Sequence, residues 1–407
     1  MTKQPKRTSP GRAQPLETVP AAPVAIQRAL DWSLALPLAV YALLSLACAT
    51  AILVVNHGLI TYTLDDGYIH LTLARNILRG HYGINPQEFA APSSSILWPF
   101  LLAPFSALPQ PVLVPILISL AASVGVIICL HRLASEVFAP LAERRQALVA
   151  ATTTLLIPVT NLVGLPWTGM EHSLQVLLAV LVLMGLLAHH RSGVAPWWLG
   201  AVLVLGPLVR YENLVLSGPA LLYLWWNGQR RTALLSGALL FAGLAGFSLF
   251  LTGIGQGFLP TSIVAKSFGS QSSSFALRIA DGIVTNLLSV EGCLLLLGAL
   301  LLLKKRSTAD APLVLVVTGA AGLHFVIGKF GWFSRYEIYI WTVTLGALLF
   351  CYRAELLALA QQRGKRLLVP ALLLLAGLPY LRTQVLTPLA TNNIYEQQFQ
   401  ISRFIAD

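Results

Sequence analysis

The sequence has few charged residues. Asp, Glu, Lys and Arg make up 11% of its 407 positions, whereas 56% are hydrophobic. Soluble globular domains carry about 25% charged residues. So little charge cannot cover the surface of a soluble domain of this length, and the composition therefore predicts a polytopic membrane protein.

Cysteine and the common cofactor motifs are also scarce. The four cysteines lie in or at the ends of apolar runs, without the spacing of metal ligands, so we predict neither a disulfide framework nor a metal site from them. The chain has no GKS/T phosphate loop, no GxGxxG after a strand, no HExxH and no GxSxG. These absences argue against a soluble nucleotide cofactor.

The apolar runs predict an all-α transmembrane bundle of about 11 spans. Residues 1–28 are rich in basic residues and proline and are expected to form a disordered cytoplasmic tail. Residues 29–381 would form the transmembrane domain, with a first outer loop at 56–111, and residues 382–407 an extracytoplasmic tail. The predicted spans are 32–55, 112–131, 147–163, 173–189, 196–209, 213–226, 232–253, 283–303, 311–328, 337–352 and 367–381.

The positions of the basic residues predict the orientation of these spans. The run Ser95 to Leu108 is short and contains Pro99 and Pro104, so we treat it as an interfacial or re-entrant segment. About two-thirds of the Lys and Arg residues then fall on the side of the N-terminus, which the positive-inside rule places in the cytoplasm. The net charge of +11 thus reflects topology, and no nucleic-acid partner is predicted.

Two adjacent carboxylates, Asp65 and Asp66, stand out in the first outer loop. They open a segment with helical periodicity that Gly80 ends, and we expect this segment to be an amphipathic helix at the membrane surface. An Asp at a helix start caps free N–H groups and is favoured by the helix dipole. One of the two is therefore interpreted as a cap and the other as a chemical group.

Further ionisable residues fall on the predicted outer side, in segments that are distant in the sequence. Ionisable groups at membrane depth are costly unless they are paired or hydrated, so they are candidates for function. The alternative is that they only extend to the lipid headgroups or anchor the chain there. The candidates are His70, Glu171, Arg210, Glu212, Lys266, Arg335 and Tyr336.

Taken together, these motifs resemble the integral-membrane C-type glycosyltransferases (GT-C fold), and among them the arabinofuranosyl- and mannosyltransferase-like branch. The resemblance covers nearly all of the chain after Trp32. The residues that carry it are LDDGYIHLTLARNILRGHYGINP (64–86), SSSILWPFLLAPF (93–105), GMEHSLQVLLAV (169–180), RYEN (210–213), AKS (265–267), RY (335–336) and NIYEQQFQ (393–400).

The resemblance implies an inverting hexosyl- or pentosyltransferase that takes its sugar from a polyprenyl-phosphate donor. Asp65 would be the general base, with Asp66 beside it, and Lys266, Arg210 and Arg335 would bind the donor phosphate. His70, Glu171, Glu212 and Tyr336 would contact substrate. The acceptor would be a glycan or lipid on the extracytoplasmic side of a bacterial inner membrane. No metal is required, although two acids near a histidine leave room for a divalent cation.

Two other functions fit the same features. A transporter or flippase for a lipid-linked sugar could use the same groove and cations, although we see no internal repeat of the kind that many transporters have. A non-catalytic lipid-binding member of the fold is the other alternative. Relatives often continue past a segment like NIYEQQ into a soluble domain, whereas this sequence ends at Asp407.

Overall fold

The computed structural model describes residues 32–142, 144–268, 275–306, 309–362, 364 and 367–406. The tail predicted at 1–28 lies outside the described residues. Every regular element formed by the described residues is helical. The elements are α1 (Trp32–Val55), α2 (Asp66–Ile77), α3 (Leu97–Leu102), η1 (Ala103–Phe105), α4 (Leu113–Val137), α5 (Arg145–Val159), η2 (Leu165–Thr168), α6 (His172–Ser192), α7 (Trp197–Val209), η3 (Tyr211–Asn213), α8 (Leu214–Trp226), α9 (Arg230–Gly253), α10 (Thr261–Phe268), α11 (Phe275–Leu288), α12 (Val290–Leu303), α13 (Ala311–Ile327), α14 (Ile338–Cys351), α15 (Arg353–Gln361), α16 (Leu368–Ala376), α17 (Leu378–Ile394), η5 (Tyr395–Phe399) and α18 (Gln400–Ala406).

Among the described residues, four helices are long and apolar enough to cross a membrane: α1, α4, α6 and α9. The number rises to seven if each of three bent helix pairs counts as one span, and α5, α7 and α13 are shorter apolar helices. Large apolar side chains on α1 and α9 are exposed, including Leu43, Leu46, Leu239 and Phe241, as expected for surfaces that face lipid. The fold is consistent with a helical membrane protein.

The run predicted as a single span at 283–303 is broken. Helices α11 and α12 meet at an angle of 93°, and Ser289 lies between them in an extended conformation. Its hydroxyl accepts a hydrogen bond from the Gly292 N–H at 2.9 Å, so it caps α12 at the point where α11 ends. Hydropathy alone did not show this break, because the residues on both sides of it, 283–288 and 292–303, are mainly apolar.

The last predicted span also differs from the structure. Helix α17 continues past residue 381 to Ile394, after a 55° bend from α16. The chain becomes more polar there, but the polar groups are used in packing against α1. Asn56 donates to the Thr391 hydroxyl at 3.3 Å, and Asn392 donates to the Val55 carbonyl at 3.0 Å. Side-chain hydrogen bonds of this kind join helices in membrane proteins.

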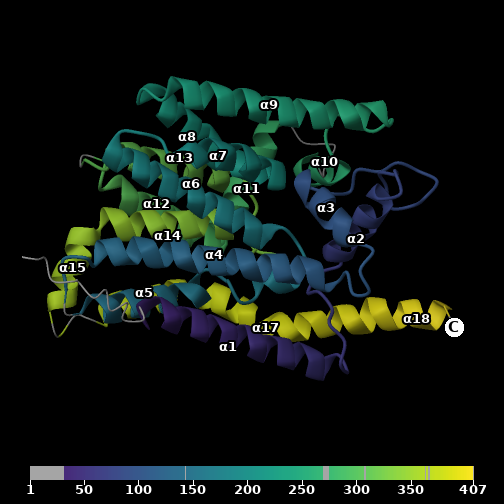
Figure 1. The fold of residues 1–407 in the computed structure, drawn as a ribbon, viewed down its shortest axis with the longest axis horizontal. Coiled ribbons are helices and arrows are strands. Elements are labelled where there is room, and N and C mark those ends of the chain that lie inside the picture. Colours follow the sequence, from purple (N-terminus) through teal and green to yellow (C-terminus); the bar gives the residue numbers. More distant parts are fainter. Residues whose placement is uncertain are drawn as a thin grey trace, which may run out of the picture. The chain divides into compact units, whose positions relative to one another are not determined.

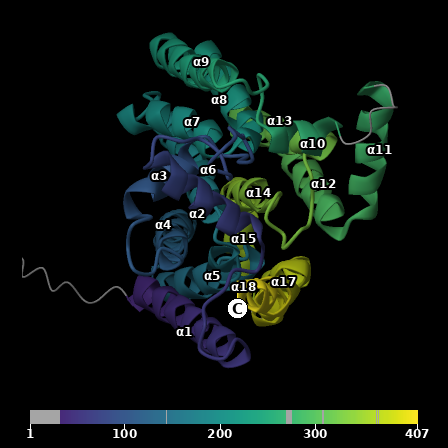
Figure 2. The same ribbon diagram turned by 90° about the vertical axis from the view of Figure 1, so that its right-hand side faces the viewer.

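Helices α6 and α14 form the centre of the bundle. In the most apolar stretch of α6, 72% of the residues are buried, and nearly every residue of α14 is buried. A helix that is apolar on all sides belongs in a core. Figure 2 shows α14 in the middle, with α1, α5 and α17 on one side and α7 to α9 on the other.

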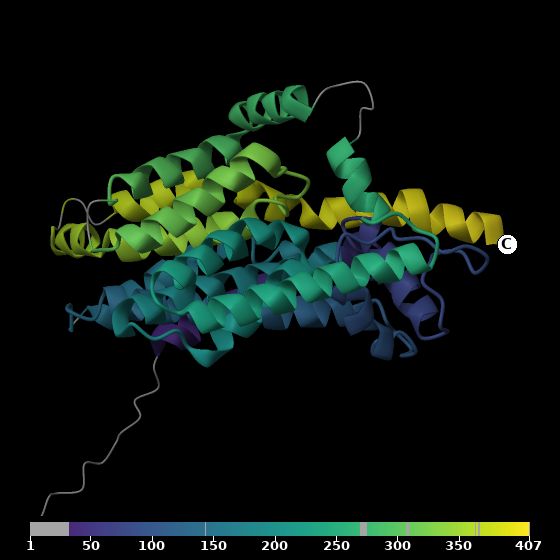
Figure 3. The ribbon, with the colours of Figure 1, turned by 90° about the horizontal axis from the view of Figure 1, so that it is seen from above.

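One end of the bundle carries the first predicted outer loop. Figures 1 and 3 show α2, α3 and α10 at this end, far from α15. The segment predicted not to span forms only the short helices α3 and η1. Helix α10 is attached to the same loop, because the Thr261 N–H donates to the Ala91 carbonyl at 3.1 Å. These elements position the candidate site.

Candidate functional site

Helix α2 begins at the predicted carboxylate pair, and the two carboxylates differ in their surroundings. Asp65 occupies the N-cap position and accepts a hydrogen bond from the Asp66 N–H at 3.0 Å; its side chain is exposed. Asp66 is the first helical residue and is about one-third exposed. The next residue is Gly67, where a Cβ atom would lie 2.5 Å from Tyr62 and 3.0 Å from the Thr168 carbonyl oxygen. The absence of that atom lets the first turn of α2 pack closely against η2.

Asp66 forms an ion pair with Arg335, 269 positions later in the chain. The distance from Arg335 Nη2 to Asp66 Oδ2 is 2.9 Å. The same Nη2 donates to the Tyr336 hydroxyl at 3.1 Å, and Nη1 contacts the Met170 sulfur at 2.9 Å. Arg335 is only 4% exposed, and its Nε has no hydrogen-bond partner among the described residues. A thioether is a weak acceptor, so this buried guanidinium retains donor capacity for an anion.

A second charged group surrounds Arg210, in the connection between α7 and α8. Glu212 accepts a two-pronged contact from the Arg210 guanidinium, and Glu171 accepts from Nη1 at 2.7 Å. Ser94 accepts a further bond from Nη1 at 3.1 Å. Burial alone would lower the pKa of Arg210, but Glu212 and Glu171 outweigh it and raise the pKa above its ordinary value. Arg210 is therefore a permanent cation whose donors are taken up by protein groups.

Tyr336 and His70 connect the two charged groups. The Tyr336 ring lies 5.0 Å from the Arg335 guanidinium and 5.9 Å from that of Arg210, within the range of cation–π attraction. His70 Nε2 lies 3.7 Å from the second oxygen of Glu171, and His70 Nδ1 lies 3.3 Å from the Ser93 hydroxyl. His70 follows Asp66 by four residues, so one face of α2 directs both side chains toward the bundle.

The structure thus brings together most of the predicted site residues. Lys266 lies in α10, but its side chain is outside the described part of the chain, so its predicted role in binding phosphate stays a prediction. Asp65 is adjacent to the cluster and does not form an ion pair within the described residues. The residues that the structure brings together are Asp66, His70, Glu171, Arg210, Glu212, Arg335 and Tyr336.

Sequence reasoning assigned no role to three residues that contact the cluster or its loop: Ser94, Met170 and Glu337. Ser94 lies in the Ser93–Ser95 run, and Met170 directly precedes the predicted Glu171. A serine run before an apolar segment and a methionine beside a buried acid are weak signals. Glu337 lies two residues after Arg335, at the N-cap of α14. Its sequence signal was stronger, because a carboxylate beside an apolar run is costly.

The described residues include no group of three or more His, Cys, Asp or Glu side chains placed to hold a metal ion. The divalent cation considered from the sequence therefore stays a prediction. The protein was also compared with models of known families, with curated proteins and with solved structures, and none of the three comparisons found a match.

Proposed function

We propose that the protein is an inverting membrane glycosyltransferase with a GT-C-like fold of about 11 spans, which uses a polyprenyl-phosphate sugar donor. The observation that carries the proposal is the contact between Asp66 and Arg335. It places a buried guanidinium with unused donor capacity against Asp66, and Asp65 directly precedes Asp66 in the chain. Sugar transfer from a lipid phosphate needs cationic donors on the departing phosphate and a base on the acceptor hydroxyl.

The two carboxylates would have different roles. In an inverting displacement the acceptor attacks the anomeric carbon from the side opposite the phosphate, so the base lies away from the cation that binds the phosphate. Asp66 is bonded to Arg335 and would orient it. Asp65 is exposed and outside this ion pair, so it can accept a proton from an incoming hydroxyl.

The proposed reaction then balances as follows. The acceptor oxygen forms a bond to the anomeric carbon while the bond from that carbon to the phosphate oxygen breaks. The hydroxyl proton passes to Asp65 and later to solvent, and the bonding pair leaves with the polyprenyl phosphate, whose charge Arg335 stabilises. A transition state resembling an oxocarbenium ion allows late deprotonation, so Asp65 need not be a strong base.

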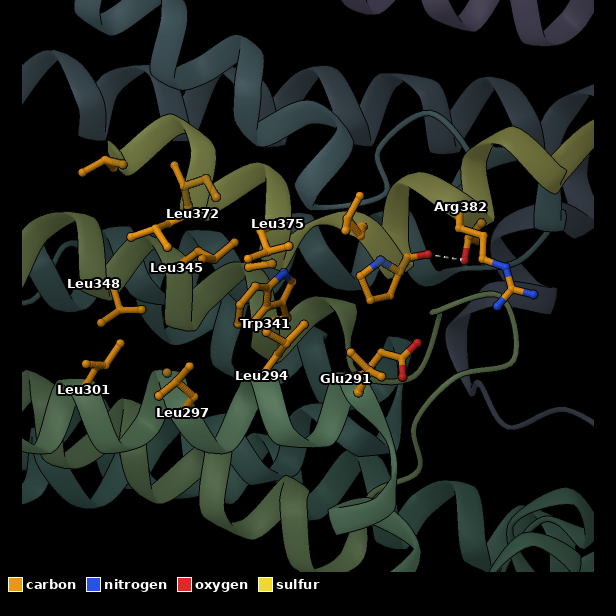
Figure 4. Close-up of a pocket in the computed structure, with 18 of the residues that line it drawn as sticks. Glu291, Leu294, Leu297, Leu301, Trp341, Leu345, Leu348, Leu372, Leu375 and Arg382 are labelled. Carbon is orange, nitrogen blue, oxygen red and sulfur yellow. Dashed lines mark hydrogen bonds between the residues drawn. The ribbon is translucent and has the colours of Figure 1, made fainter. Parts of the chain in front are cut away.

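A groove of about 1010 Å³ supports a lipid donor. It is lined mainly by leucines of α12, α14, α16 and α17, and Figure 4 shows Glu291 and Arg382 at one end and Leu301 and Leu348 at the other. Phe333, two residues before Arg335, lines the groove. An apolar groove that reaches the loop bearing the phosphate cation suits an isoprenoid chain attached to a phosphate.

The location follows from the same proposal. The end of the bundle that carries α2 would face the extracytoplasmic side of a bacterial inner membrane, as the distribution of Lys and Arg predicts. The acceptor would be a glycan or a lipid presented at that surface.

Transport of a lipid-linked sugar is a second candidate, favoured by the bent pairs α11–α12, α14–α15 and α16–α17. Interrupted helices often surround substrate sites in transporters. The two functions differ in their product, because a transporter forms no new glycosidic bond.

Replacing Arg335 by Lys tests the phosphate site. Lysine retains the positive charge but cannot use two parallel N–H groups on one phosphate. The loss of one charge-assisted hydrogen bond, worth about 1.5–3 kcal/mol, should raise the KM for the donor by roughly 10- to 100-fold. Arg191→Lys is the matched control, because Arg191 pairs with Glu136 outside the cluster and its replacement should leave the KM unchanged. If the donor KM is unchanged in Arg335→Lys, Arg335 does not bind the donor phosphate.

A further inference from the structure

The loop between α13 and α14 has an unusual backbone. Gly331, Trp332, Phe333 and Ser334 have φ angles of 81°, 48°, 66° and 49°, so four consecutive residues adopt the left-handed conformation. For a residue other than glycine this conformation costs roughly 1–2 kcal/mol. Three such residues in a row require specific contacts to hold them, and Arg335 follows them directly.

Four hydrogen bonds hold this left-handed turn. The Arg335 N–H donates to the Gly331 carbonyl at 3.3 Å, and the Gly331 N–H donates to Glu337 Oε2 at 3.0 Å. Asn161 donates to the Phe333 carbonyl at 3.1 Å, and the Ser334 and Thr383 hydroxyls are 3.2 Å apart. Among these partners only Glu337 titrates, and it binds the first amide of the turn that ends at Arg335.

The Glu337 carboxyl is in a poor environment for negative charge. Its side chain is fully buried, and Oε1 has no hydrogen-bond partner among the described residues. The described groups that act on it electrostatically are Glu291 from α12 and the phenol of Tyr380 from α17, and neither is a cation. The nearby cation, Arg335, donates to Asp66 instead.

The same geometry favours the neutral acid. Burial raises the pKa of Glu337 to about 8, although its own backbone N–H and the N–H of Gly331 act in the opposite direction. The carboxyl is therefore neutral below about pH 8 and ionised above it. Ionisation leaves a buried carboxylate with one oxygen unpaired, which is costly, whereas an open turn would allow water to hydrate the carboxylate.

We propose that Glu337 is a proton-dependent positioning residue, whose neutral carboxyl keeps the 331–334 turn closed and whose ionisation opens it. In the closed turn Arg335 is held against Asp66, so alkaline pH would release the guanidinium from the cluster. This inference goes beyond the proposed sugar transfer, since it concerns the state of the loop whatever reaction the cluster performs.

Hydrogen exchange of the amides in 331–335, measured from about pH 5 to about pH 10 on the purified full-length protein, tests the inference without an activity assay. Glu337→Gln keeps the shape and a neutral acceptor oxygen but cannot ionise. Comparing the wild type with this variant at each pH cancels the intrinsic pH dependence of exchange. The ratio of the wild-type rate to the variant rate should increase by up to about tenfold per pH unit between the ordinary pKa of Glu and the raised pKa of Glu337. Above the raised pKa the ratio should be constant, because the closed and the open turn are then both ionised.

Glu291→Gln supplies an independent test if Glu337→Gln does not fold. Removing the Glu291 charge, which adds to the effect of burial on the pKa of Glu337, should lower that pKa in the closed turn. The increase of the exchange rate caused by opening should then level off at a lower pH, and at a smaller extent of opening, than in the wild type. The proposal is overturned if the wild type and Glu337→Gln keep a constant ratio of rates over this range. It is equally overturned if Glu291→Gln leaves the pH at which opening levels off unchanged.

Discussion

Replacement of Asp65 by Asn is expected to lower sugar transfer by about 10²- to 10⁴-fold, the usual effect of removing a general base. Asn has nearly the size of Asp and caps a helix about as well, and Asp65 is exposed, with its carboxylate bonded to the Asp66 N–H. The melting temperature should therefore stay close to that of the wild type. Initial rates with labelled donor, together with thermal melts, measure both quantities.

Asp66→Asn is the matched control for this effect. The amide can still accept a hydrogen bond from Arg335 but carries no charge. The buried Arg335 side chain would therefore be oriented less firmly. We expect a smaller loss of activity than in Asp65→Asn, with a higher KM for the donor. A wild-type rate in both variants would mean that the two carboxylates serve only to cap α2. A larger loss in Asp66→Asn than in Asp65→Asn would mean that Asp66 is the general base.

Replacement of Arg210 by Met is expected to destabilise the protein by about 3–5 kcal/mol, because it removes one partner of a buried ion pair. Glu171 is fully buried and would lose its Arg210 partner, whereas Glu212 is 26% exposed and can be hydrated. A large decrease in the melting temperature in detergent or lipid measures the effect. The role of Arg210 in binding phosphate, predicted from the sequence, is separable from this structural effect only in a variant that remains folded.

A double variant provides that control. Glu171→Gln combined with Arg210→Met removes both charges and should recover part of the lost stability, since a buried amide is much less costly than a buried unpaired carboxylate. If Arg210→Met alone melts at the wild-type temperature, then Glu171 and Arg210 do not form the buried pair on which this account depends.

Sequence patterns predicted the helices that are uniformly apolar. Helix α1 has the predicted bounds, 32–55, because a long run without charge permits only one assignment. The patterns did not locate the break at Ser289 or the extension of α17 to Ile394. Both features depend on the hydrogen-bond partner of a polar side chain. The Ser289 hydroxyl accepts from an N–H of α12, and Asn392 donates to the Val55 carbonyl at the end of α1. Hydropathy contains no information about such partners.

The candidate site shows the same limit. The sequence identified the acids and cations of the predicted outer loops, since charge is rare in this chain, but it did not show how they pair. Arg335 lies 269 positions from Asp66, so only the fold reveals the contact. One local signal was available: the spacing of four between Asp66 and His70 places these two side chains, and not Asp65, on the buried face of α2.

The most direct test of the proposed function is transfer of a labelled sugar by the wild-type protein in lipid vesicles, with a panel of polyprenyl-phosphate sugars and candidate glycan and lipid acceptors. The account predicts that at least one donor yields a labelled glycoside and a free polyprenyl phosphate in equal amounts, and that Asp65→Asn suppresses both. Binding of the donors without any labelled product across the panel, with or without movement of the lipid-linked sugar between leaflets, would contradict it.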